Sequence, residues 1–122
     1  MDKISARLNY IKNDLYGKSS LNTKCSQFFK RSILHIAISL EVGTSHFNDE
    51  VISYEIICKN IPTKLGSRSS IQSILNTATH NGYFIKKELR KDKRVKTYSF
   101  SEEYESMIIN WVDNQRKDMG LL

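Results

Sequence analysis

The 122-residue chain has two cysteines, one proline and no long apolar run, and these scarcities exclude several classes of protein. No run approaches the roughly 20 apolar residues of a transmembrane helix, and the chain begins with an amphipathic segment rather than the apolar core of a signal peptide. We therefore expect a cytoplasmic protein with no membrane partner. The length suits one domain, and the 39% hydrophobic content suits one modest core.

Metal-binding and catalytic motifs are also missing. Cys25 and Cys58 lie on apolar helix faces without the paired spacing of a zinc site, which predicts reduced, buried thiols, with an isolated disulfide as the alternative. The three histidines, His35, His46 and His80, are scattered, and there is no Gly-rich phosphate loop. We expect no cofactor, no metal and no enzymatic activity, and no residue specifies a small-molecule effector.

Acidic residues are outnumbered, with 13 Asp and Glu against 19 Lys and Arg, a net charge of +6. Seven basic residues and two acidic ones fall between Tyr83 and Tyr98, a net charge of +5, so one element carries almost all of the excess. Aromatic and β-branched residues around a polar turn predict a β-hairpin there. A basic hairpin favours contact with phosphates, and a merely solvated hairpin is the alternative. The expected phosphate-binding residues are Lys91, Lys93, Arg94 and Lys96.

The segment before the hairpin has the period of an amphipathic helix. Ser67 is the expected N-cap and Gly82 the expected stop. The apolar stripe consists of Ile71, Ile74, Leu75 and Ala78. The opposite face holds no acid and consists of Ser69, Gln72, Ser73, Asn76 and His80. These side chains can all hydrogen-bond to bases or phosphates, although a core helix with a solvated polar face has the same pattern.

Four further helices are expected around this unit. A first helix falls within residues 1–20, and a second runs from Lys24 to Leu40 and is closed by Gly43. A third is capped by Ser53 and ended by Pro62. The stripe of the first helix is Ile4, Leu8, Ile11 and Leu15, and that of the last helix, within 101–122, is Tyr104, Met107, Ile108, Trp111 and Val112.

Three short motifs extend this pattern: Ser67-Arg-Ser-Ser-Ile, Asn81-Gly-Tyr-Phe-Ile, and Asp92-Lys-Arg-Val-Lys-Thr-Tyr-Ser-Phe-Ser-Glu102. Together they make the stretch from Ile52 to Ser101 resemble the winged helix-turn-helix of the multiple-antibiotic-resistance-regulator (MarR) family of bacterial transcription factors. The fold class expected is therefore mainly α with a small β-hairpin wing, flanked by additional N- and C-terminal helices. We divide the single domain into an N-terminal helix (1–20), a winged-helix core (24–100) and a C-terminal helix (101–122).

The resemblance also implies roles for particular residues. The acidic residue of the wing signature, Asp92, would brace the wing through Arg94, and Arg94 or Lys93 would enter the minor groove. The terminal helices would build a two-fold dimer. Packing of both terminal helices onto their own domain is the alternative.

The resulting hypothesis is a double-stranded DNA-binding transcriptional regulator, with a recognition helix in the major groove and a basic wing on the backbone or minor groove. Arg68, Gln72 and Asn76 are the candidates for base reading, because Arg, Gln and Asn offer bidentate geometries. The candidates for phosphate contact at the helix are Ser67, Ser69, Ser70 and Ser73. The alternative is a winged-helix module that docks proteins or assists replication or recombination without sequence-specific DNA binding.

Overall fold

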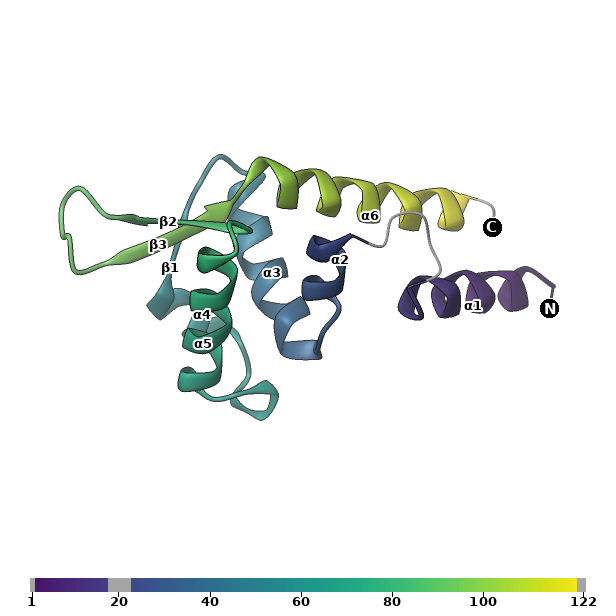
Figure 1. Ribbon diagram of the computed structural model, residues 1–122, viewed down its shortest axis with the longest axis horizontal. Coiled ribbons are helices and arrows are strands. Elements are labelled where there is room, and N and C mark those ends of the chain that lie inside the picture. Colours follow the sequence, from purple (N-terminus) through teal and green to yellow (C-terminus); the bar gives the residue numbers. More distant parts are fainter. Residues whose placement is uncertain (1, 18–22, 121–122) are drawn as a thin grey trace.

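The computed structural model describes residues 2–17 and 23–120, which form an elongated, mainly helical molecule with a wing at one end and both chain termini towards the other (Figure 1). None of its helices is long and apolar enough to cross a membrane within these residues. The elements in order are α1 (Asp2–Leu15), α2 (Lys24–Phe29), α3 (Ile33–His46), β1 (Ile52–Ser53), α4 (Tyr54–Asn60), the 3₁₀ helix η1 (Thr63–Leu65), α5 (Arg68–His80), β2 (Phe84–Glu88), β3 (Lys96–Phe100) and α6 (Glu102–Gly120).

The predicted hairpin is confirmed as β2 and β3, and it belongs to a three-stranded antiparallel sheet in the order β1-β3-β2. Phe84 pairs with Phe100 at the base of the wing and Glu88 pairs with Lys96 towards its tip. The short strand β1 was not expected. Its residue Ile52 pairs with Tyr98, and this pairing joins the start of α4 to the root of the wing.

The prediction of one helix from Lys24 to Leu40 is wrong. The structure has two helices, because Ser32 starts a new one by accepting a hydrogen bond from the backbone N–H of His35 at 3.2 Å. The predicted stop at Gly43 is also wrong, since α3 continues to His46. Gly43 lies inside the helix where the ring of Phe100 packs against it, and a Cβ there would come within 3.0 Å of that ring.

Aromatic rings fill the centre of the core. Tyr104 of α6 is fully buried, contacts the rings of Phe84 and Phe100, and shares a 2.7 Å hydrogen bond with the buried Ser39 hydroxyl. Further along α6, Trp111 packs edge-on against Phe29, with ring centroids 5.1 Å apart. The first half of α6 therefore packs onto its own domain.

Short polar signals set the ends of α4 and α5 as expected. The Ser53 and Ser67 hydroxyls accept hydrogen bonds from the backbone N–H groups of the third helical residues, at 3.3 and 3.1 Å. The turn before Pro62 ends α4 at Asn60. After α5, Gly82 adopts φ +78°, the left-handed conformation that favours glycine. The stripe of Ile71, Leu75 and Ala78 is buried, with Ile74 half-buried, so the opposite face of α5 looks outward.

Helix α1 extends beside the C-terminal part of α6 at the end of the molecule farthest from the wing (Figure 1). Asp14 joins it to α2 through a 2.6 Å ion pair with Lys30. Its predicted stripe is largely exposed, with exposed fractions of 55% for Ile4, 61% for Leu8 and 64% for Leu15. The predicted extension of this helix to residue 20 falls partly on residues 18–20, which lie outside the described residues.

Candidate nucleic-acid interface

Helix α5 and the wing border one exposed groove of about 280 Å³. Gln72 lines it from α5, and Lys86, Arg94 and Lys96 line it from the wing. Its floor includes Tyr98 of the central strand, whose phenol pKa is raised by burial and whose hydrogen bond with Gln72 opposes that rise. The polar helix face and the basic hairpin, which the sequence suggests separately, thus meet on one surface.

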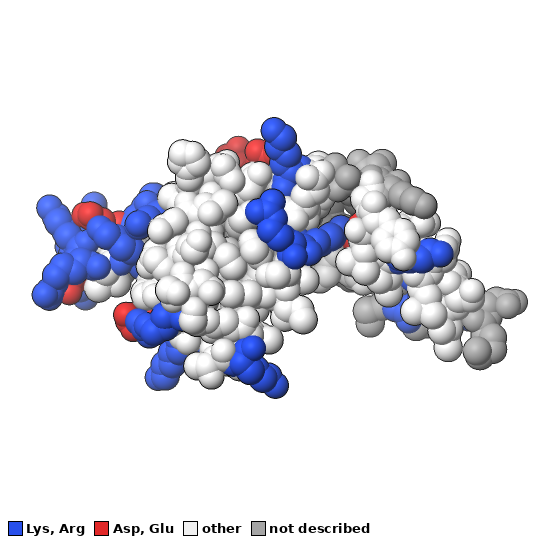
Figure 2. Space-filling view, turned by 60° about the horizontal axis from the view of Figure 1, so that its bottom comes forward, with Lys and Arg blue, Asp and Glu red and all other residues white. Residues whose placement is uncertain are grey.

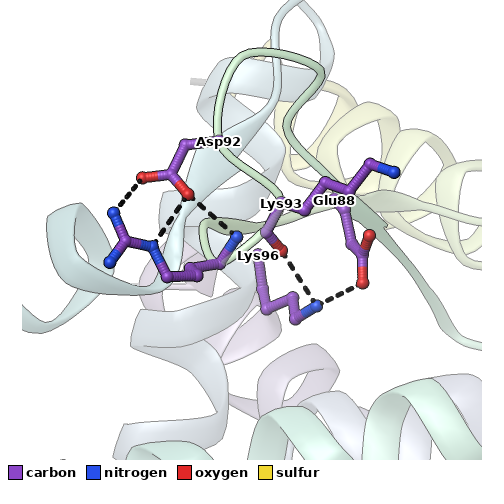
Figure 3. A network of polar contacts seen from close by, with 5 residues as sticks. Glu88, Asp92, Lys93 and Lys96 are labelled. Carbon is purple, nitrogen blue, oxygen red and sulfur yellow. Dashed lines mark hydrogen bonds and ion pairs between the residues drawn. The ribbon is translucent and has the colours of Figure 1, made fainter.

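The wing carries the densest group of cations in the view of Figure 2, at the left end of the molecule. Most of its basic side chains are exposed, and in the described part of the chain no acidic side chain pairs with Lys91 or Lys93 at the turn. Lys96 is different, because its ammonium group lies 2.6 Å from Glu88 Oε1 and also donates to the Lys93 carbonyl at 3.2 Å (Figure 3). Lys91 and Lys93 are therefore the freer cations at the tip.

Asp92, labelled in Figure 3, forms three hydrogen bonds with Arg94 within the turn. Asp92 Oδ1 accepts from both the backbone N–H and the Nε of Arg94, at 3.0 and 3.1 Å, and Oδ2 accepts from Nη2 at 3.3 Å. Arg94 holds the pKa of the Asp92 carboxyl below its ordinary value. The side chain of Arg94 is nevertheless 91% exposed, so the contact orients the guanidinium without covering it. A role for Arg94 in DNA binding stays a prediction.

The serines at the start of α5 form a local hydrogen-bond cluster. The Ser67 hydroxyl lies 3.2 Å from that of Ser69 and 3.1 Å from that of Ser70, and it also caps the helix. All three are exposed, as is Ser73 one turn further along. Since α5 has no acid in its first turn, its N-terminus keeps the positive end of the helix dipole facing solvent.

The three candidates for base reading differ in their present partners. Gln72 donates to Asn76 Oδ1 at 2.9 Å, so these two amides form one pair along the exposed face of α5. Arg68, the first residue of α5, lies 2.7 Å from Glu55 Oε1, and its guanidinium carbon lies 5.3 Å from the centre of the Tyr54 ring. The ion pair raises the pKa of Arg68 above its ordinary value.

Sequence reasoning missed three groups at this interface: Glu55 and Tyr54 at the start of α4, and Lys86 on β2. Glu55 is an acid in the first turn of a helix, which has an ordinary explanation in the helix dipole. Nothing local indicates that it pairs with a residue 13 positions later. Lys86 contributes to the predicted charge excess, but only the pairing of β2 with β3 shows which side of the wing it occupies.

In residues 2–17 and 23–120 no group of three His, Cys, Asp or Glu side chains could hold a metal ion. Both cysteines are free thiols, with Cys25 buried and Cys58 half-buried. Burial, with a contribution from Glu103, raises the pKa of the Cys25 thiol to about 12.

This geometry defines a winged helix-turn-helix protein. No protein-family model matches the sequence. No curated protein matches it either. Solved structures do match. FabT of Streptococcus pneumoniae in complex with DNA is 19% identical, with a TM-score of 0.55, over 97% of this chain and 77% of that one. YusO of Bacillus subtilis is 12% identical, with a TM-score of 0.55, over 98% and 80%.

A mutant of ZitR from Lactococcus lactis is 10% identical, with a TM-score of 0.54, over 70% of this chain and 56% of that one, so the match spans little more than half of the ZitR chain. These neighbours are MarR-family winged-helix regulators. The chain has their fold, which confirms the resemblance expected from Ile52 to Ser101 and the fold class expected from the sequence.

Proposed function

We propose that this protein is a double-stranded DNA-binding transcriptional regulator that places α5 in the major groove and the wing on the adjacent backbone or minor groove. The observation that carries the proposal is the shared groove, which Gln72 lines from the helix and Lys86, Arg94 and Lys96 line from the wing. A rod-shaped polyanion is the ligand that would contact both sides at once. The likeness to FabT, which was solved with DNA, supports this choice.

Within this proposal the polar side chains of the interface divide into two roles. Arg68, Gln72 and Asn76 read base edges, since they follow one another at intervals of four residues along the outward face of α5. The hydroxyls at the helix start and the wing cations contact phosphates and set the register. The phosphate-contacting residues are Ser67, Ser69, Ser70, Ser73, Lys91, Lys93, Arg94 and Lys96.

We also propose that the protein acts as a homodimer in the cytoplasm and has no catalytic activity. The exposed stripe of α1 supports dimerisation, because contiguous apolar surface on a helix is ordinarily covered by a partner. Ile109 and Val112 of α6 are 43% and 42% exposed and add to this surface. A two-fold dimer would present two copies of α5 to one pseudopalindromic duplex.

A fluorescence-anisotropy titration with random-sequence duplex at low and moderate salt tests DNA binding. We expect a dissociation constant of roughly 10⁻⁴ to 10⁻⁶ M at physiological salt, rising steeply with salt concentration. No measurable binding would overturn the proposal and favour a protein-docking module. Selection of bound duplexes from a random pool then tests specificity and symmetry together, since a dimeric regulator should recover a palindromic motif.

A further inference from the structure

The position of Arg68 is unusual for a cation. It is the first residue of α5, where the positive end of the helix dipole disfavours a positive charge. The compensating acid comes from a different helix, because Glu55 lies in the first turn of α4. Tyr54, beside Glu55, completes the contact: its hydroxyl donates to the Arg68 carbonyl at 3.2 Å and its ring lies under the guanidinium.

Stability does not account for this arrangement. The Arg68 and Glu55 side chains are 58% and 73% exposed, and ion pairs that open to solvent contribute little to folding. Glu55 is, moreover, the one acid among the described residues that line the groove between α5 and the wing. The dipole of α4 favours an acid at this position, but an acid there also weakens the attraction of the groove for phosphate, so its placement in the groove calls for a further explanation.

The geometry of the contact supplies one. Glu55 engages only the Nη2 atom of Arg68, at 2.7 Å, and within the described part of the chain no acceptor contacts Nε or Nη1. A guanidinium held in this way keeps hydrogen-bond donors for a second planar acceptor, as guanine O6 and N7 require. A backbone phosphate that approached the same donors would meet the carboxylate of Glu55 and be repelled.

We propose that Glu55 is a positioning residue for DNA recognition, which holds the Arg68 guanidinium towards a guanine and disfavours its use on the phosphate backbone. This inference rests on the proposed function. It assigns Glu55 to specificity rather than affinity: the residue weakens binding to unrelated duplex and strengthens discrimination at the base pair that Arg68 reads.

The test compares Glu55→Gln with the matched control Glu102→Gln, which removes the same charge from an exposed position at the start of α6. Anisotropy titrations use random duplex, the duplex recovered by selection, and its single-base-pair variants. For Glu55→Gln we expect about threefold tighter binding to random duplex and a salt slope steeper by about one unit, as one more cation meets phosphate. Discrimination at one base pair should fall about fivefold or more.

Three further variants make the result specific to the pair of Glu55 and Arg68. Arg68→Ala should abolish discrimination at the same base pair, and adding Glu55→Gln to it should change that discrimination no further. Glu55→Asp, which keeps the charge on a shorter side chain, should restore part of the discrimination. Melting temperatures should be unchanged, because neither side chain is buried.

If Glu55→Gln and Glu102→Gln raise the affinity for all duplexes equally and leave base-pair discrimination intact, the inference is overturned, since Glu55 would then act only through net charge. Base-pair preferences unaffected by Arg68→Ala would overturn it as well. If the unmodified protein binds no duplex at all, the proposed function fails, and the inference fails with it.

Discussion

The two ends of this molecule expose opposite kinds of surface. At the wing end the exposed side chains are mostly cations and hydrogen-bonding groups, and at the α1 end they include four aliphatic side chains in helical register. Figure 2 shows the basic side chains gathered most densely over the wing, with fewer of them over the opposite end. The core between them holds Tyr104 and its aromatic neighbours in fixed contact.

The difference indicates two kinds of partner. Exposed cations are stable in water and gain free energy only when they meet an anion such as a phosphate backbone. Burial of aliphatic surface is favourable by about 25 cal/mol for every square ångström removed from water. The exposed aliphatic side chains therefore favour burial against another apolar surface. The contrast supports the two partners proposed above, nucleic acid at the wing end and a second copy of the chain at the α1 end.

The largest effect is expected from placing a charge in the α1 stripe. Leu8→Glu should convert the proposed dimer to a monomer, because a carboxylate cannot be buried there without a partner. Binding to a palindromic duplex should fall about a hundredfold, since two linked recognition helices bind far more tightly than one. Light scattering at tens of micromolar measures the mass, and anisotropy measures the affinity.

The matched control is Asn9→Glu, which adds the same charge at an exposed position on a different face of α1. It should leave both mass and affinity unchanged. A wild-type protein that is strictly monomeric at this concentration would contradict the proposal that the α1 end forms a dimer interface.

A smaller effect is expected from removing a charge at the wing. Arg94→Ala should weaken binding about tenfold on every duplex at low salt and flatten the salt slope by about one unit, because one phosphate contact is lost. Lys12→Ala removes an equal charge from α1 and serves as the control, with no change in slope expected. An unchanged slope for Arg94→Ala would remove the wing from the interface.

A change in the amide pair of α5 should act on specificity alone. Gln72→Ala should lower discrimination about fivefold at one base pair, the low end for a base contact, because Gln72 must first release Asn76. Ser73→Ala is the comparison, since a phosphate-contacting hydroxyl should affect all duplexes equally. Competition among single-base-pair variants of the selected duplex separates the two patterns. Equal losses on every duplex for Gln72→Ala would contradict its assignment to base reading.

Features with a local cause could be predicted from the sequence. The caps at Ser53 and Ser67 and the stop at Gly82 depend on residues within one helical turn, and all three are confirmed. The hairpin follows from aromatic and β-branched residues on both sides of a polar turn. The charge excess of the wing is a property of composition, so the sequence alone predicts a basic surface there.

Features that depend on residues far apart in the chain could not be predicted from the sequence. Strand β1 exists because Ile52 pairs with Tyr98, 46 positions later, and two residues carry no periodic signal. The ion pair between Glu55 and Arg68 depends on how α4 crosses α5. Both require tertiary contacts that single-residue propensities do not contain. The break between α2 and α3 is different, because its signal, the capping hydroxyl of Ser32, is local and the prediction of one helix overlooked it.

The two cysteines offer a chemical test of the packing at both ends. Cys25 lies under α6 towards the α1 end, and burial raises the pKa of its thiol to about 12, so almost none of it is thiolate at pH 8. Cys58 on α4, at the wing end, is only half-buried. Ellman's reagent at pH 8 should therefore label one thiol per native chain and two in urea. Cys58→Ser should abolish the native reaction and Cys25→Ser should preserve it, whereas rapid labelling of Cys58→Ser protein would mean that α6 does not seal the core at that end.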